Sequence, residues 1–245
     1  MTKSVEHGLE TVEPLIRAGP CSQARHQSKA TSWAASQAAS WATSQAAEVD
    51  SRGDHAAVCK CGGYKTIRHS RIVAMLRRIL RESSAAVAPT EVPVHGWRRA
   101  DGTGARLDVA YWADGVRHYV DVTVRHPRAV KYRIAAARAD GAAAAEAERN
   151  KRLRYPAMAD RGLSAVRPFA VESFGRFGEE ALAVLGEARH RVAERVGRRA
   201  SGSVASRWFG LLQCQLVLAQ HEAAMAIEGA RMAPLGLASL PFVRQ

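Results

Sequence analysis

The sequence has few cysteines and no long apolar segment, and each absence excludes a class of protein. The four cysteines among its 245 residues (Cys21, Cys59, Cys61 and Cys214) are too few and too scattered for a disulfide framework. No uncharged apolar run approaches the roughly 20 residues that cross a bilayer. The first residues, MTKSVEHGLETVEP, carry acids where a signal peptide carries an apolar stretch. We therefore expect a soluble intracellular protein without a membrane partner.

Acidic residues are also scarce relative to basic ones. The chain has 36 Lys and Arg against 23 Asp and Glu, a formal net charge of +13, while its 47% hydrophobic content suffices for a core. On a folded protein, this excess most often indicates a polyanionic partner, usually nucleic acid. An Arg-rich product of a GC-rich genome is the alternative. Residues 1–50 contain four basic and five acidic residues, so residues 51–245 carry +14.

An internal repeat separates the N-terminal segment from the rest of the chain. Residues 31–46 read TSWAASQA and then ASWATSQA, an eight-residue unit repeated twice. So short a unit does not build a solenoid, whose repeats have about 20 residues or more. A low-complexity linker is the favoured interpretation, and we place a domain boundary between the repeat and Asp54.

From residue 54 onward the pattern is that of a globular domain. Residues 67–82 carry apolar residues at helical spacing, with arginines on the other face. A short extended piece is expected at 90–95, which follows Pro89 and contains Pro93. Residues 105–112 and 117–124 are rich in β-branched and aromatic residues, which predicts two strands.

The second half of this region is mostly helical. An Ala-rich stretch, 133–155, is interrupted at Gly141 and so predicts one broken helix or two helices. Residues 165–172 form another apolar extended run. Two amphipathic helices follow at 179–197 and 204–228, each closed by a glycine. This order predicts an α/β fold in which helices flank a small central mixed sheet, with a helical pair at the C-terminal end.

Two aspartates are expected to face each other in this sheet. Asp114-Gly115 is a strong two-residue hairpin signal, and the register it sets places Asp108 opposite Asp121. Their Cβ atoms would lie about 4.5–5.5 Å apart, where two carboxylates repel each other. Mg²⁺ would offset that repulsion, because it is usually held by one or two carboxylates together with phosphate oxygens and waters. A register slip of one residue would instead separate the pair.

A lysine further along the chain is a candidate partner for this pair. Ala147, Glu148, Lys151 and Tyr155 share one face of the expected helix. Lys151 could lie over the aspartates and stabilise charge on a scissile phosphate or position the attacking water. The alternative is an ordinary solvated lysine.

Several other residues have both a functional and an ordinary interpretation. Glu82 and Glu91 could supply a third carboxylate to a metal, although surface glutamates are commoner. Three tryptophans could stack on bases, although core or rim positions are commoner. They are Trp97, Trp112 and Trp208. Cys214 lies on an apolar helix face and is predicted to be a buried thiol.

Several blocks resemble the restriction-like endonuclease domain of non-LTR retrotransposons. Residues 54–76 (DHAAVCKCGGYKTIRHSRIVAML) resemble the knuckle and first helix of that family. RLDVAYW, containing Asp108, and YVDVTVRHP, containing Asp121, resemble its diverged PD-(D/E)XK core. AEAERNKRLRY resembles its helix with a migrated lysine, and PFAVESFGRFG and the closing helices also resemble the family. The resemblance covers about residues 54–230.

The resemblance implies an enzyme. Such a domain nicks target DNA so that a reverse transcriptase can prime on the exposed 3′ end. Asp108 and Asp121 would bind Mg²⁺ or Mn²⁺, and Lys151 would be the catalytic lysine. DNA is the implied partner, and RNA is left open. A reverse transcriptase module is expected in a full-length relative. The nucleus is the expected compartment, otherwise the cytoplasm. Five basic residues are expected to contact nucleic acid: Arg68, His69, Arg125, Arg149 and Arg152.

The sequence departs from the family pattern at several positions. Leu107 replaces the proline before the first aspartate. Thr123 stands where a plain (D/E)XK motif has its lysine, so the catalytic lysine would be Lys151 or, less favoured, Lys131. The knuckle lacks the cysteine pair upstream of its histidine. Zinc would therefore depend on a degenerate ligand set: His55, Cys59 and Cys61.

These observations divide the chain into five expected parts. They are a low-complexity, poorly ordered segment at 1–53, a degenerate knuckle at 54–66, a restriction-endonuclease-like core at 67–178, C-terminal helices at 179–230 and a loose tail at 231–245. The expected function is a metal-dependent DNA endonuclease domain of a retrotransposon, in a truncated copy. The alternative is a catalytically decayed fragment that only binds nucleic acid.

Overall fold

The structure, a computed structural model, describes residues 52–59, 63–88, 91–155 and 165–232. The expected segments at 1–53 and 231–245 lie almost entirely outside these ranges. The described helices are α2 (Asp54–Val58), α3 (Tyr64–Glu82), α4 (Arg133–Arg138), α5 (Ala142–Arg154), α6 (Glu179–Val196) and α7 (Arg198–Met232). The strands are β1 (Ala86–Val87), β2 (Val92–Arg98), β3 (Gly104–Leu107), β4 (Val109–Ala113), β5 (Val116–Arg125) and β6 (Arg167–Glu172).

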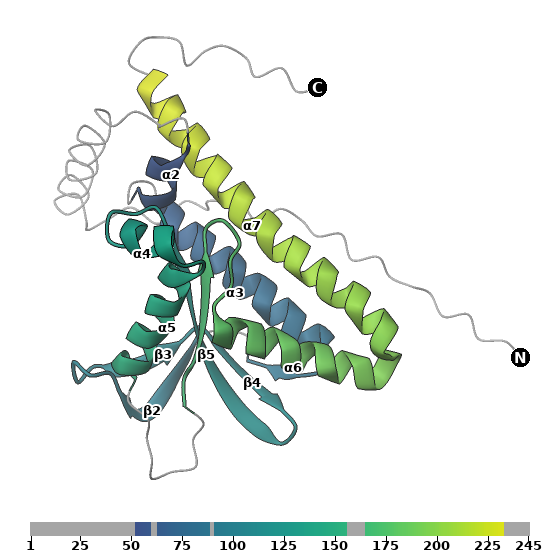
Figure 1. The fold of residues 1–245 in the computed structure, drawn as a ribbon. Helices are drawn as coiled ribbons and strands as arrows, with labels where there is room; N and C mark the ends of the chain where they lie inside the picture. The colour runs from purple at the N-terminus through teal and green to yellow at the C-terminus, as the bar shows by residue number, and fades with distance from the viewer. Residues whose placement is uncertain (1–51, 60–62, 89–90, 156–164, 233–245) are drawn as a thin grey trace, which may run out of the picture. The chain divides into compact units, whose positions relative to one another are not determined.

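The main sheet is mixed, as predicted. Its strand order is β1-β4-β5-β6, with β1 and β5 antiparallel to β4 and β6 parallel to β5. The connection from β5 to β6 contains α4 and α5, which supplies the crossover that a parallel pair requires. β2 and β3 form a separate two-stranded antiparallel hairpin. The fold is therefore α/β, and it ends in two long helices, α6 and α7 (Figure 1).

The turn between β4 and β5 sets the register that the sequence predicts. Asp114 and Gly115 both have positive φ, 54° and 76°, as a type I′ turn requires. Ala113 therefore pairs with Val116, and the ladder continues without a slip to Val109 opposite Val120. Because side chains alternate between the faces of a strand, this register also decides which residues of β5 are buried on each side.

Helices cover both faces of the sheet. Val120 and Val122 of β5 belong to a buried core that also contains Leu76 of α3, Leu185 of α6 and Leu212 of α7. Fully burying a side chain of this size contributes roughly 1.5–3 kcal/mol. The Ala-rich face of α5 packs on β6 from the opposite side of the sheet (Figure 1). Since alanine side chains are short, α5 lies close to the strands.

The boundaries of several elements differ from the prediction. The 105–112 strand is two strands, β3 and β4, which meet at Asp108. The Ala-rich stretch is two helices, because Gly141 takes a left-handed conformation (φ 76°) at the start of α5. The last helix starts at Arg198, before the expected 204, and it continues through Gly229.

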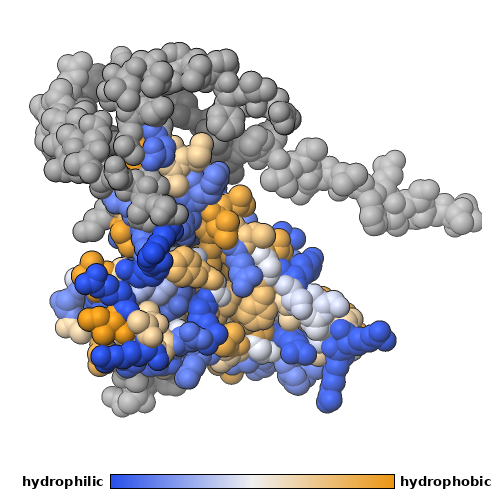
Figure 2. Space-filling model, turned by 45° about the horizontal axis from the view of Figure 1, so that its top comes forward, coloured by the Kyte–Doolittle hydropathy of each residue, from blue (hydrophilic) through white to orange (hydrophobic). Residues whose placement is uncertain are grey.

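The prediction that Cys214 is buried is wrong, because its side chain is exposed. The buried residues of α7 recur every three or four positions and include Trp208, Leu212 and Leu216. Cys214 is two residues from Leu212 and from Leu216, so it lies on the opposite face of the helix. Exposed hydrophobic residues on α7, such as Val217, are scattered; Figure 2 shows hydrophobic patches set among hydrophilic residues.

None of the helices within the described ranges combines the length and the apolar character that crossing a membrane requires.

Candidate active site

Asp108 lies where the chain passes from the small hairpin to the main sheet. Leu107, the last residue of β3, pairs with Val92, whereas Val109, the first of β4, pairs with Val120. Asp108 is thus the single residue between two strands, and it is buried, with 8% of its surface exposed. The break in the predicted strand falls at the residue that the sequence singles out for chemistry.

Asp121 lies in the middle of β5 and is also buried, at 5% exposure. Continuing the observed β4–β5 register by one position brings Asp121 opposite Asp108, so the register prediction is confirmed. The two carboxyl groups are within hydrogen-bonding reach of each other. The structure therefore brings together two acidic side chains that are 13 positions apart.

Lys151, on α5, completes this cluster. Its Nζ donates to Asp121 Oδ2 at 2.6 Å, and both side chains are largely buried. Thr123, at the position of the lysine in a plain (D/E)XK motif, is buried two residues beyond Asp121. The less favoured candidate, Lys131, is instead exposed and pairs with Glu146 at 2.7 Å. Of the two candidates, only Lys151 contacts an aspartate of the pair.

Two further groups hold the Asp108 carboxylate in place. His69 Nε2, from α3, lies 3.2 Å from Asp108 Oδ2, and the Val122 backbone N–H donates to the same oxygen at 2.7 Å. Arg77, about two turns further along α3 than His69, donates to the Asp108 carbonyl at 2.5 Å. His69, predicted to contact nucleic acid, is therefore a neighbour of the aspartate pair.

The two aspartates have opposite pKa shifts. Burial alone would raise the pKa of Asp108, but hydrogen bonds from His69 and Asp121, with the His69 charge and the Val122 amide, outweigh it and lower the pKa. Burial raises the pKa of Asp121; Lys151 opposes this shift, and the hydrogen bond and charge of Asp108 add to it. The pair thus retains a proton more readily than two separate aspartates would.

Tyr155 is a member of this cluster to which the sequence gives no role. It is buried at 3% exposure, one residue after α5. Burial, followed by the charge of Asp121 and a hydrogen bond to that carboxylate, raises the pKa of its phenol. The signal was available, because Lys151 and Tyr155 are four residues apart and share a helix face.

The donor set fits a hard divalent cation better than zinc. Within the described ranges, no group of three or more His, Cys, Asp or Glu is arranged to hold a metal ion. Two carboxylates satisfy Mg²⁺, which completes its shell with phosphate oxygens and waters. The raised pKa of Asp121 fits as well, because burial and the neighbouring Asp108 disfavour its negative charge, and a bound cation would offset both.

Two of the three expected zinc ligands, His55 and Cys59, lie within α2 and directly after it. Cys59 is buried at the end of α2 and packs with Ala56, Ala223 and Ile227. Cys61 lies outside the described residues, as does Cys21. A knuckle zinc site stays a prediction, and its one described cysteine is part of a hydrophobic cluster.

Neither candidate third carboxylate is used at the site. Glu82 accepts hydrogen bonds from Arg78, Arg207 and the buried Trp208, and Glu91 pairs with Arg106 at 3.2 Å. Trp208 is accordingly a core residue. Trp112 is 41% exposed with a guanidinium 4.7 Å from its ring centroid, and the side chain of Trp97 lies outside the described residues.

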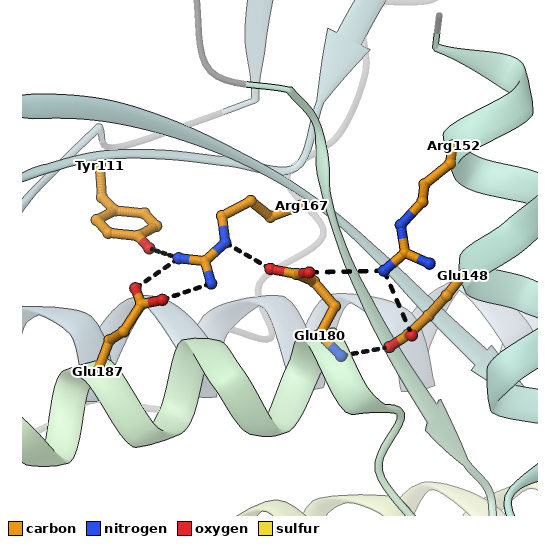
Figure 3. Close-up of polar contacts among 6 residues, drawn as sticks. All are labelled: Tyr111, Glu148, Arg152, Arg167, Glu180 and Glu187. Atoms are coloured by element: carbon orange, nitrogen blue, oxygen red, sulfur yellow. Dashed lines mark hydrogen bonds and ion pairs between the residues drawn. The ribbon is translucent and has the colours of Figure 1, made fainter. Parts of the chain in front are cut away.

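The remaining residues predicted to bind nucleic acid lie in different surroundings. Arg68 is buried and donates to the Ala57 carbonyl at 2.8 Å. Arg125 is half-buried at the end of β5, and Arg149 is exposed on α5. Arg152 pairs with Glu148 and Glu180 at 3.8 and 3.5 Å (Figure 3), so its charge is partly neutralised within the protein.

Two glutamates to which the sequence gives no role fix α5, the helix that carries Lys151. Glu172, at the end of β6, accepts hydrogen bonds from the Ala143 and Ala144 amides at 3.0 and 3.2 Å and so caps the start of α5. Glu148, one turn before Lys151, accepts the Glu180 amide at 3.1 Å at the start of α6 (Figure 3).

An arginine on β6 extends this network about two turns along α6. Arg167 binds Glu180 at 2.7 Å, Glu187 through two nitrogens and the Tyr111 hydroxyl at 3.1 Å (Figure 3). Its side chain is 13% exposed. Because a two-nitrogen pairing to a carboxylate fixes orientation, the network locks α6 against β4 and β6.

The chain matches no protein-family model and no curated protein at a significant level.

Proposed function

We propose that this protein is a metal-dependent DNA endonuclease. The observation that carries the proposal is the convergence of Asp108, Asp121 and Lys151 from a strand junction, a strand and a helix, with the lysine 2.6 Å from Asp121. The resemblance of the sequence to retrotransposon restriction-like endonucleases supports it, because the same three residues carry that resemblance. Nicking of target DNA for target-primed reverse transcription is the biological role we propose.

The residues of the chain have separate tasks in this proposal. Asp108 and Asp121 would hold Mg²⁺, which when bound polarises a phosphodiester and lowers the pKa of a water. His69 and the Val122 amide fix one oxygen of Asp108 and so its orientation. Lys151 would stabilise the negative charge that develops on the scissile phosphate. The cluster is buried, which strengthens these electrostatic effects.

The charge distribution supports DNA as the substrate. Residues 51–245, which contain the cluster, carry a formal net charge of +14. A phosphate backbone approaching two carboxylates is repelled unless surrounding cations offset that repulsion. In the proposal, the excess of basic residues therefore offsets the repulsion between the DNA phosphates and the two aspartates. A reverse transcriptase module as partner and a nuclear location follow from the resemblance alone.

Nicking of supercoiled plasmid tests the proposal. The full chain should convert it to the open-circular form with Mg²⁺ or Mn²⁺ and not with chelator, and Asp121→Asn should lose at least about 100-fold in rate. Asp140→Asn is the matched control, since this side chain is 85% exposed. Tight, salt-sensitive DNA binding without cleavage at any metal concentration would favour the decayed, binding-only alternative.

A further inference from the structure

A pocket of about 240 Å³ lies beside the aspartate pair, between α3 and the end of β5. We call it the basic pocket. His69 lines it and also contacts Asp108, so the pocket adjoins the site directly. Its other polar side chains are those of Lys65, Arg68, Thr123, Arg125, His126 and Tyr132. No acidic residue is among those that line it, in the part of the chain that the structure describes.

Arg68 is a buried cation without a carboxylate partner among the described residues. It is 5% exposed, and its one side-chain hydrogen bond is to the Ala57 carbonyl. Its Nε is buried and has no hydrogen-bond partner in the described part of the chain. Burying a guanidinium is costly unless an anion offsets its charge. Within the described ranges, no carboxylate is hydrogen-bonded or ion-paired to Arg68.

Arg125, on β5, also lines the basic pocket. It is half-buried at the end of β5, and its Nε is also buried without a partner among the residues described. Asp121, Thr123 and Arg125 alternate along one face of the strand. Four residues of strand span about 13 Å, which corresponds to a few nucleotides of a DNA strand.

We propose that the basic pocket binds a backbone phosphate of the DNA strand that enters the Asp108–Asp121 site. A phosphate would supply the missing negative charge to Arg68 and Arg125, and both guanidinium groups can donate to its oxygens. This inference rests on the proposed function, because DNA is the substrate that it assumes. It adds the side from which the strand approaches, along β5 past Arg125.

Salt-dependent DNA binding tests the pocket without any cleavage. The full-length Arg125→Gln variant should bind duplex oligonucleotides more weakly whatever their sequence, and the slope of log K against log salt should fall by about one. Arg189→Gln is the matched control, since Arg189 is exposed on α6 and does not line the pocket. Equal slopes for Arg125→Gln, Arg189→Gln and the unmodified protein would overturn the proposal.

A second variant and a second readout keep the outcomes separate. Arg68→Lys retains the charge, so it should bind DNA more tightly than Arg68→Gln. Circular dichroism checks that the two variants are equally folded. Equal affinity of the two variants for DNA would count against the pocket. If the unmodified protein never nicks DNA but Arg125→Gln alone lowers the salt slope, the nuclease proposal fails and the pocket stands. If nicking occurs and Arg125→Gln has the same salt slope as Arg189→Gln, the pocket fails and the nuclease proposal stands.

Discussion

Lys151 on α5 donates a 2.6 Å hydrogen bond to Asp121 on β5, across the interface between a helix and the central sheet. The contact joins residues 30 positions apart, and it depends on the alanines that let α5 approach the sheet. It also leaves Asp121 paired with a cation on one side and with Asp108 on the other. The arrangement accounts for two buried acids that would otherwise repel each other.

Divalent cations should stabilise the folded protein. Because only the folded chain brings the Asp108 and Asp121 carboxylates together, Mg²⁺ should bind the folded state and not the unfolded one. At a concentration 100 times the dissociation constant, the free energy of unfolding should rise by about 2.7 kcal/mol. Urea unfolding with and without Mg²⁺ measures this. Asp121→Asn should lose the increment and Asp140→Asn should keep it; an equal increment in Asp121→Asn would place the cation elsewhere.

Gly178→Ala should destabilise the protein by about 1–3 kcal/mol, because the new methyl would collide with the Glu148 carboxylate at the start of α6. The backbone at Gly178 has an ordinary φ of −71°, so strain in a left-handed conformation is not the source of the cost. Gly186→Ala, in the same helix with open space around it, should stabilise by about 0.5–1 kcal/mol. Urea unfolding measures both.

The double variant Gly178→Ala with Glu148→Ala tests the cause. If the collision is the reason, removing the carboxylate should recover part of the loss, so the two changes will not add. Additive losses would show that Gly178 is needed for another reason.

His126 should make stability depend on pH. Burial lowers its pKa, the nearby cations Arg68 and Arg128 add to this, and Asp54 opposes it. Below about pH 6.5 the unfolded chain therefore binds a proton that the folded protein resists. The free energy of unfolding should fall as the pH falls through that value, by at most about 1.4 kcal/mol per pH unit.

The comparison variant is His126→Gln, which keeps a polar group near Ser173 and Asp54, the two hydrogen-bond partners of the ring. Other histidines titrate in both proteins, so the difference between the two pH profiles isolates His126. Parallel profiles between pH 5 and 8 would contradict the assignment.

Local signals in the sequence were enough to predict the sheet and the aspartate pair. Asp114-Gly115 determines the β4–β5 turn, the turn determines the register, and the register brings Asp108 opposite Asp121. Similarly, Gly141 marks the break between α4 and α5. Each of these inferences depends on backbone preferences over a few residues, where sequence patterns are most informative.

The support around Lys151 could not be predicted in the same way. Glu172 caps a helix that begins 30 residues earlier in the chain, and Glu148 meets the amide of Glu180. These contacts depend on how elements cross in space, which local periodicity does not specify. The same limit explains why the prediction for Cys214 was wrong. Apolar residues of α7 lie on its exposed side as well as on its buried side, as Val217 and Met225 do, so they do not mark the face that packs.

The most direct test of the central claim is the nicking rate of two lysine variants at saturating Mg²⁺, under single-turnover conditions. Lys151 contacts Asp121, whereas Lys131 is exposed and pairs with Glu146. Lys151→Met should therefore reduce the rate about 100- to 1,000-fold, while Lys131→Met stays within a few-fold of the unmodified protein. Equal rates for Lys151→Met and the unmodified protein would contradict the proposed active site.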